Sequence, residues 1–327
     1  MIHSKIIKPL LLQGLIASSL LGTTTCVLAD TFPDRPIRII VNTGPGGLVD
    51  LSTRMVAEKM SENLGQPVVV ENRAGGDGGL GARTVKTAKP DGYTLLSSAG
   101  TVVIQPLVKL NPIYGMKDFT GVGPVLRSSV LMVTGASRPD KTLADFIARA
   151  KANPGKMTYA SAGVGTTTHI GAALFLKQAG LNLLHVPYKG NGTAMPDVIS
   201  GRVDMIFEAY GSGAPKVSSG TLKALAVTST SRLADLPDVQ TFAEQGVKDF
   251  SYYLWVGMLA PSGTPEPVVK RLNEALQYAL NSKQITDRFR KDGSEALSMT
   301  PKEFDEFLVS EEGKMAATVK DLGIEKQ

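Results

Sequence analysis

Two glycine-rich segments place small and hydroxyl-bearing residues where an apolar run gives way to a helical pattern. One is Ile39-Ile-Val-Asn-Thr-Gly-Pro-Gly-Gly47, before a helix expected to start near Leu48. The other is Ala160-Ser-Ala-Gly-Val-Gly-Thr-Thr-Thr-His169, before a helix expected over Ile170–Gln178. The first amides of a helix lack intrahelical partners and carry partial positive charge. Each segment therefore predicts an anion site that needs no metal, and the pair predicts a ligand held from both sides.

The second segment adds three consecutive hydroxyl groups, those of Thr166, Thr167 and Thr168. One threonine is expected to cap the helix, and three exceed what capping requires, so we expect a contact with a carboxylate. His169 falls in the first helical turn, where the helix dipole disfavours a cation. A neutral, structural imidazole is the favoured interpretation of His169, with a ligand contact as the alternative.

Further polar residues follow expected strands, where ligands bind in open α/β sheets. Tyr188 follows the strand expected over Leu183–Val186, which also carries His185, interpreted as a structural histidine. Glu208 and Tyr210 follow the strand expected over Met205–Phe207. Glu208 would accept a hydrogen bond from a ligand or simply bind water, and the sequence leaves both open.

Motifs of catalysis and of cofactor binding are absent from the sequence. It contains no H-E-x-x-H, G-x-S-x-G or P-loop pattern, and no metal or cofactor is expected. The segment Gly76-Asp-Gly-Gly-Leu-Gly81 matches G-x-G-x-x-G, but it does not directly follow its strand and no acidic residue lies about twenty residues on. We interpret it as a turn in which glycines permit close backbone packing.

The first 29 residues have the pattern of a secretory signal peptide. Lys5 and Lys8 precede an apolar run, and Val27-Leu-Ala29 is a small-residue cleavage site. Cleavage after Ala29 removes the one cysteine, Cys26, and lowers the net charge from +5 to +3. Lipidation of Cys26 is the alternative, although Thr23-Thr-Thr25 matches such sites poorly. The mature protein is expected to be exported and soluble.

The composition, 43% apolar and 20% charged in 327 residues, fits a globular protein of two domains. Because 35 basic residues face 30 acidic ones without like-charge blocks, nucleic acid is not an expected partner. Apolar runs alternate with amphipathic segments such as Leu51–Leu64, which predicts an α/β fold with mainly parallel sheets. Capping boxes at Thr142 and Thr300 and the pair Thr264-Pro265 mark three helix starts.

Ordered motifs along nearly the whole mature chain resemble the substrate-binding proteins of tripartite tricarboxylate transporters, the Bug family. They are Phe32-Pro-Asp-Arg-Pro-Ile-Arg38, Pro45-Gly-Gly47, Gly65-Gln-Pro-Val-Val-Val-Glu-Asn-Arg73, Pro90-Asp-Gly-Tyr-Thr-Leu95, Ala152-Asn-Pro-Gly-Lys156, Tyr159-Ala-Ser-Ala-Gly163, His185-Val-Pro-Tyr-Lys-Gly190, Gly201-Arg-Val-Asp204, Leu225-Ala-Val-Thr228 and Leu259-Ala-Pro-Ser-Gly-Thr-Pro265.

The resemblance implies a periplasmic-binding-protein fold, type II-like, with two α/β lobes and a ligand cleft between them. It places lobe 1 at residues 31–128 and 252–327, and lobe 2 at residues 129–251. The implied ligand is a small organic carboxylate, clamped by Thr43–Asp50 and Gly163–His169. The implied contact residues are Thr43, Gly46, Gly47, Asp50, Ser98, Gly100, Gly165, Thr166, Thr167, Thr168, His169, Tyr188, Glu208 and Ala209.

Some residues depart from the family pattern that the resemblance brings with it. Asn42-Thr-Gly-Pro-Gly-Gly47 stands where Pro-Phe-Pro-Pro-Gly-Gly is common, so a small hydroxyl replaces an aromatic wall. Leu48-Val49 replaces small polar residues, and Glu208 stands where aspartate is usual. The identity of the carboxylate is therefore left open.

The function expected from the sequence is that of a monomeric periplasmic receptor, without catalytic residues, that delivers a carboxylate to membrane transporter subunits. The alternatives are an exported lyase or hydrolase of carboxylic acids, and a sensor protein that feeds a signalling partner. Turnover of a bound acid would separate the enzyme from the receptor.

Overall fold

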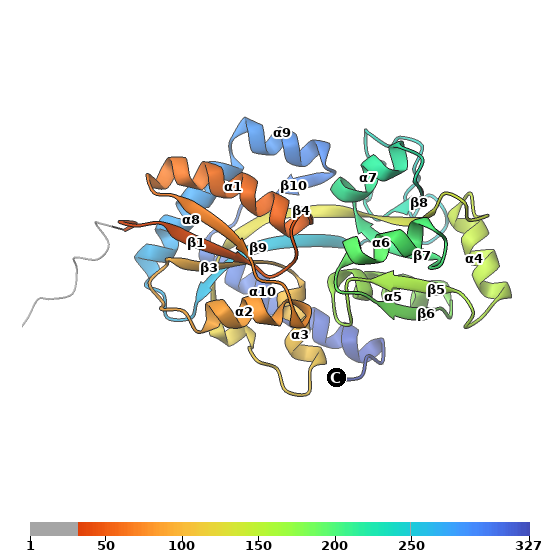
Figure 1. Cartoon of the computed structure of the whole chain (residues 1–327), viewed down its shortest axis with the longest axis horizontal. Helices are drawn as coiled ribbons and strands as arrows, with labels where there is room; N and C mark the ends of the chain where they lie inside the picture. Colours follow the sequence, from red (N-terminus) through yellow and green to blue (C-terminus); the bar gives the residue numbers. More distant parts are fainter. Residues whose placement is uncertain (1–31, 249) are drawn as a thin grey trace, which may run out of the picture. The chain divides into compact units, whose positions relative to one another are not determined.

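The computed structural model of the chain describes residues 32–248 and 250–327 (Figure 1). Residues 33–327 form one compact unit, to which the rest of the description refers. The expected signal peptide, Cys26 and the cleavage site after Ala29 lie outside the described residues. Within the described residues, no helix combines the length and apolar character needed to cross a membrane.

The described chain alternates strands with helices. The strands are β1 (Ile37–Val41), β2 (Val68–Asn72), β3 (Thr94–Ala99), β4 (Phe119–Gly135), β5 (Thr158–Ser161), β6 (Leu184–Pro187), β7 (Met205–Ala209), β8 (Leu222–Val227), β9 (Tyr253–Pro261) and β10 (Ser294–Ala296). The helices are α1 (Leu48–Leu64), α2 (Gly79–Lys86), α3 (Thr101–Val108), α4 (Leu143–Ala152), α5 (Thr167–Ala179), α6 (Asn191–Ile199), α7 (Tyr210–Ser218), α8 (Glu266–Leu280), α9 (Lys283–Lys291) and α10 (Pro301–Asp321), with short 3₁₀ turns η1 (Gly76–Gly78) and η2 (Met116–Asp118).

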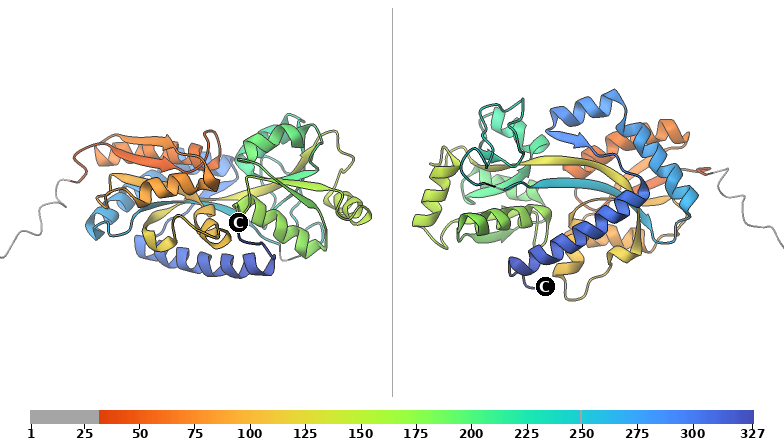
Figure 2. Two further views of the ribbon diagram at one scale, coloured as in Figure 1. Left: turned by 60° about the horizontal axis from the view of Figure 1, so that its bottom comes forward. Right: turned by 180° about the vertical axis from the view of Figure 1, so that it is seen from behind.

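The strands form a curled sheet in the order β2-β1-β3-β9-β4-β7-β5-β6, with β8 and β10 also paired to β4. The 17-residue β4 is central to this order. Its first part pairs with β9 and β10 up to Ser129, and its last part pairs with β7 and β8 from Val130 onward. In Figures 1 and 2, β4 and β9 run side by side between the two groups of elements.

The prediction of mainly parallel sheets was wrong for the middle of the sheet. Among the described strands, β1 pairs in parallel with β2 and β3, and β5 does so with β6 and β7. Every pairing of β4 and β9 is antiparallel. The expectation considered only strands linked by crossover helices, which are parallel, whereas β9 brings the chain back in the opposite direction. The expected strand Leu131–Thr134 is only the end of β4.

Alternation along the last part of β4 builds two cores, one on each face of the sheet. Val130 and Met132 belong to a cluster with Phe146 of α4 and Phe175 of α5. Leu131 and Val133 belong to a second cluster with residues of α6 and α7. Successive strand side chains point to opposite faces, so this short stretch anchors both layers of helices.

A third cluster covers the first group of strands. It joins Ile40, Leu96 and Leu259, from three neighbouring strands, to Phe304 and Leu308 of α10. Figure 2 shows α10 lying beside α3, along one face of this group. The strand ends that carry the expected site residues therefore rest on closely packed cores.

Most of the expected helix boundaries are confirmed. Gly65 ends α1 in the left-handed conformation with φ 68°, which glycine adopts at little cost. Thr142 and Thr300 cap α4 and α10, each in a capping box. Pro265, expected as the first helical residue, is instead the N-cap of α8, and the helix begins one residue later at Glu266.

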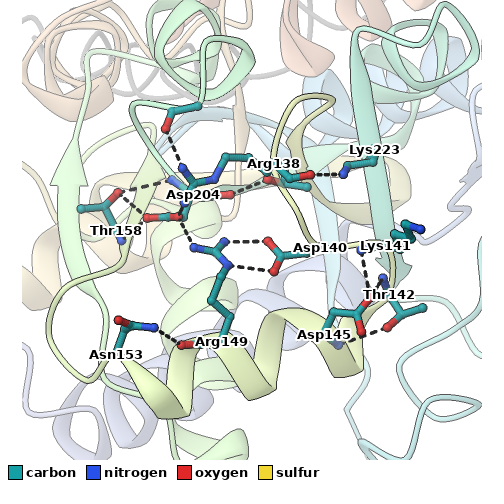
Figure 3. A network of polar contacts seen from close by, with 12 residues as sticks. Arg138, Asp140, Lys141, Thr142, Asp145, Arg149, Asn153, Thr158, Asp204 and Lys223 are labelled. Carbon is teal, nitrogen blue, oxygen red and sulfur yellow. Dashed lines mark hydrogen bonds and ion pairs between the residues drawn. The ribbon is translucent and has the colours of Figure 1, made fainter.

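A network of ionic and hydrogen-bonding side chains joins the elements around β7 (Figure 3). Asp204, just before β7, forms ion pairs with Arg138 and with Arg149 of α4, the latter at 2.8 Å. Its second carboxylate oxygen accepts from the Thr158 amide of β5 at 2.9 Å. Arg149 also binds Asp140 through two hydrogen bonds, of 2.8 and 2.6 Å. Asp204 thus fixes two strands and one helix.

Replacement of Asp204 by asparagine should destabilise the protein by about 3 kcal/mol, because the partly buried Arg138 loses its carboxylate partner and Arg149 keeps only Asp140. Urea unfolding of the Asp204→Asn variant measures the change. Asp287→Asn is the control, since Asp287 pairs with Lys283 at an exposed site on α9 and should lose less than about 1 kcal/mol. Equal losses in the two variants would contradict the role of Asp204.

Candidate functional site

The first glycine-rich loop, residues 43–50, is organised by a carboxylate of its own. Asp50 is 2% exposed and accepts hydrogen bonds from the Gly46 amide at 2.9 Å, Arg54 Nε at 3.0 Å and Asn72 Nδ2 at 2.9 Å. Asn72 Nδ2 also donates to the Thr43 carbonyl at 3.1 Å. The structure therefore places Asp50 as the residue that shapes the loop, with Thr43, Gly46 and Gly47 around it.

The G-x-G-x-x-G segment packs against the end of β1, as expected for a close-packing turn. A Cβ atom at Gly78 would lie 2.7 Å from Asn42 Nδ2, and one at Gly81 would lie 2.7 Å from Asn42 Cβ. Asn42 Nδ2 donates to Ser98 Oγ at 2.9 Å, which links the ends of β1 and β3. The glycines bring α2 close enough to hold Asn42 in place.

Hydrogen bonds in the second loop, residues 163–169, separate the roles of its three threonines. Thr166 Oγ1 donates to the Gly163 carbonyl at 2.7 Å and accepts from the His169 amide at 3.4 Å, so Thr166 is the cap. Thr168 Oγ1 accepts from the Ala162 amide at 3.1 Å and donates to Asn191 Oδ1 at 3.4 Å. The Thr166 proton is therefore used within the loop, and the Thr168 proton is used by Asn191 of α6.

Thr167 differs from its neighbours because its hydroxyl has no hydrogen-bond partner among the described residues. The Thr167 amide donates to Thr101 Oγ1 at 3.4 Å, and the Thr167 carbonyl accepts from the Tyr252 hydroxyl at 2.6 Å. A Cβ atom at Gly100 would lie 3.2 Å from Thr167 Cγ2. Thr167 therefore stands where the second loop meets the start of α3.

A chain of polar side chains connects the second loop to the end of β7. Asn191, the first residue of α6, donates from Nδ2 to Glu208 Oε2 at 2.6 Å. Ser212 of α7 donates to the other Glu208 oxygen. Burial raises the pKa of the Glu208 carboxyl, and the hydrogen bonds from Ser212 and Asn191 oppose that rise. Glu208 and Ala209 thus lie where the first turns of α6 and α7 meet.

His169 and His185 form a stack of neutral rings with Tyr159. The imidazole centroids are 4.1 Å apart, and the Tyr159 ring lies 4.8 Å from that of His185. His169 Nδ1 accepts from the Gly165 amide at 3.2 Å, so this nitrogen carries no proton. Burial lowers the pKa of His169 to about 4, and burial together with the charge of His169 lowers that of His185 to about 3.

The Ser161 hydroxyl lies 2.6 Å from His185 Nε2, a pairing that occurs in nucleophilic catalysis. Here Ser161 is fully buried, and its oxygen also bonds the amide and the carbonyl of Gly163, both at 3.1 Å. The lowered pKa makes His185 a weak base. The pair therefore serves to hold the second loop.

A cavity of about 530 Å³ lies beside the second loop. Its lining residues are Asp77, Gly163, Val164, Pro187, Tyr188, Lys189, Thr193 and Gln327. A smaller cavity of about 30 Å³ includes Gly100, Thr167 and Trp255 in its lining. Neither cavity is lined by residues 43–50. The described residues contain no group of three histidine, cysteine or acidic side chains placed to hold a metal ion.

The predicted site residues fall into two sets that meet at Gly100 and Thr167. One surrounds the ends of β1 and β3, and the other surrounds the starts of α5, α6 and α7. A further link is Leu48 of the first loop, which packs against the cluster that contains Phe207. Tyr188 belongs to neither set. Its hydroxyl donates to Asp197 at 2.6 Å, and the residue lines the larger cavity.

Residues 52–324 match the family model described as tripartite tricarboxylate transporter family receptor. The chain belongs to this receptor family. A protein from Pseudomonas sp. (strain P51), named UPF0065 protein in tcbD-tcbE intergenic region, is 36% identical over 302 residues, which cover 92% of this chain and 90% of that protein. The resemblance inferred from the motifs is thus confirmed.

Solved structures of binding proteins have the same fold as this receptor. The periplasmic binding protein BugD matches with a TM-score of 0.85 at 33% identity, covering 90% of this chain and all of that one. An R. palustris protein solved with adipate matches with a TM-score of 0.86 at 30% identity over the same shares. MatC from Rhodopseudomonas palustris, solved with malate, has a TM-score of 0.81 at 28% identity, over 88% and 100%. The receptor therefore has the expected two-lobed α/β fold.

Three residues that contact the site were not identified from the sequence of the receptor, namely Asn42, Asn191 and Gln105, whose Nε2 donates to the Val164 carbonyl of the second loop at 2.9 Å. Asn42 directly follows an apolar strand, and Gln105 interrupts the apolar run Val102–Val108. A polar residue at such a position is a signal that could have identified each of them. Asn191 had no such signal, since its role depends on Thr168 and Glu208, which lie far from it in sequence.

The histidine stack predicts a loss of stability in acid. Because the folded pKa values of about 4 and about 3 lie below the unfolded value of about 6.5, the unfolded chain takes up protons first as the pH falls. The stability that the neutral rings provide is complete above pH 6.5 and is lost toward pH 4, by about 3 kcal/mol for His169.

Urea unfolding of wild type and of a His169→Gln/His185→Gln variant, between pH 7 and pH 4.5, tests this prediction. The stability difference between the two proteins should shift in favour of the variant as the pH falls. Tyr159→Phe is the control, because it alters the stack but keeps both imidazoles. A difference that stays constant with pH would contradict the prediction.

Proposed function

We propose that this solute-binding receptor captures a small organic carboxylate between residues 43–50 and residues 163–169. The hydroxyl of Thr167 carries the proposal, because it is the one threonine hydroxyl of the second loop whose proton the described residues do not use. The amides at the starts of α1 and α5 that the loop side chains leave unpaired contribute to the same anion. The adipate and malate in the titles of two structural neighbours support a carboxylate ligand.

The proposal divides the chain into lobe 1, residues 31–128 and 252–327, and lobe 2, residues 129–251. The change of pairing partners along β4 after Ser129 and the start of β9 at Tyr253 support these boundaries. A ligand that touches both lobes favours the arrangement in which it can do so, and the two crossing strands allow the lobes to move about them.

The receptor is proposed to act as a periplasmic monomer after cleavage behind Ala29, and to deliver its ligand to the membrane subunits of a tripartite transporter. The family match supports this assignment. Incubation of the protein with a bound acid, followed by analysis of that acid, tests the receptor against a carboxylic-acid lyase or hydrolase. Recovery of the unchanged acid is expected, and turnover that scales with protein concentration would refute the proposal.

Substitution of Gly47 by valine should abolish the thermal stabilisation that a bound carboxylate provides. Gly47 has φ −87°, and a Cβ atom there would meet no atom within 4 Å, so valine fits the unbound fold while its side chain occupies the proposed anion site. Gly313→Val on α10 is the matched control, since its Cβ would also meet open space. Normal calorimetric binding by Gly47→Val would contradict the contribution of the first loop.

Replacement of Thr167 by valine should weaken carboxylate binding by about tenfold or more, because a hydrogen bond to a charged group is lost. The unfolding free energy should change little. Thr166→Val should instead cost about 1 kcal/mol of stability, because Thr166 caps α5. Isothermal titration calorimetry and urea unfolding of both variants make the comparison. Unchanged affinity in Thr167→Val would remove the second loop from the clamp.

A further inference from the structure

The second loop belongs to lobe 2, and two of its glycines bring it against lobe 1. A Cβ atom at Gly163 would lie 2.8 Å from Asp77 Oδ1, and a Cβ atom at Gly165 would overlap Val108 Cγ2. The φ angles are 133° at Gly163 and 69° at Gly165, a region that residues with side chains rarely adopt. A side chain at either position would therefore push the loop away from lobe 1.

Polar groups of lobe 1 complete this contact. Gln105 is 2% exposed, and its Nε2 donates to the Val164 carbonyl at 2.9 Å. Asp77 is the one non-glycine residue with positive φ in the described part of the chain, at 54°. Its Oδ2 accepts from Lys109 Nζ at 2.9 Å, which holds the carboxylate beside the loop. Such a backbone conformation costs energy and persists only where the surrounding structure enforces it.

Apolar side chains join the same two parts of the chain next to the loop. Ile170 of α5 is fully buried in a cluster whose other buried members all lie in lobe 1, namely Ile104, Val108 and Val319. Separation of α5 from α3 would expose these side chains to water, which is unfavourable in proportion to their apolar area. The contacts are between protein atoms, so they need no ligand.

We propose that these contacts form a clasp that keeps the second loop on lobe 1 in the ligand-free receptor. The clasp consists of Asp77, Gln105 and Val108 on lobe 1 and residues 163–165 on lobe 2. The inference rests on the lobe boundaries of the proposed function and adds a closed ligand-free state. A receptor held in this way does not have to close its lobes when it binds, so no binding free energy is spent on closure.

Small-angle X-ray scattering of the ligand-free chain from Asp30 onward tests the clasp, after native mass spectrometry has shown that no small molecule is bound. The wild-type profile should fit the structure of residues 33–327. Gly165→Ala should increase the radius of gyration, because the new methyl group overlaps the fully buried Val108. Gly180→Ala is the matched control and should keep the wild-type profile. The φ of Gly180 is 64° and its Cβ would meet no atom within 4 Å, so the same backbone strain arises without contact to lobe 1.

A double-variant cycle tests the contact between Asp77 and Gly163. In urea unfolding of the ligand-free protein, Gly163→Ala should lower the midpoint further than Gly190→Ala, because Gly190 has a similar φ of 127° and its Cβ would meet open space. Asp77→Gly removes the carboxylate and tolerates the positive φ, so it should restore at least half of this additional loss. Asp77→Gly should restore none of the loss caused by Gly165→Ala, whose methyl group meets a different residue.

The possible results separate the clasp from the proposed function. A wild-type profile more extended than the structure, equal profiles for Gly165→Ala and Gly180→Ala, or independent effects of Asp77→Gly and Gly163→Ala would each overturn the clasp and leave the carboxylate receptor intact. If circular dichroism shows that Gly165→Ala does not fold, the wild-type profile and the cycle of Asp77 and Gly163 decide the question. Failure of the wild-type protein to bind any carboxylate would instead refute the proposed function, without effect on these ligand-free measurements.

Discussion

The antiparallel pairing of β4 with β9 is the constraint on which the rest of the structure depends. The first part of the continuous strand β4 pairs with β9, and its last part pairs with β7 and β8. Because strand side chains alternate between faces, its last part also supplies residues to two separate cores. The positions of the other strand ends, and of the loops that follow them, are set relative to this pair of strands.

On this frame, the two glycine-rich loops are stabilised by different means. The first is closed by a buried aspartate that accepts three hydrogen bonds, whereas the second is closed by its own threonines and a neutral histidine. In both, side chains satisfy backbone groups that a helix start leaves unpaired. The Thr167 hydroxyl is the one threonine hydroxyl of the second loop that the described residues leave unpaired.

Some buried polar side chains are fully paired within the fold, and others keep one unpaired atom. Asp204 and its arginines form a paired network around β7, on which strand and helix positions depend. Asn42 and Gln105 each use one amide atom to fix a loop and leave the other unpaired.

Much of this protein follows from its sequence alone. Local signals, such as the capping residues at Thr142 and Thr300 and the glycine at position 65, act over a few residues and predicted the helix boundaries. The ordered motifs predicted the family and hence the two-lobed fold. The tertiary structure decided which polar groups are used up. Thr166, Thr167 and Thr168 are equivalent in the sequence, but their hydroxyls differ because Gly163, Asn191 and Ala162 reach two of them and not the third. Such pairing depends on the directions and distances between segments that are remote in sequence. The spacing of residues along the chain does not contain this information.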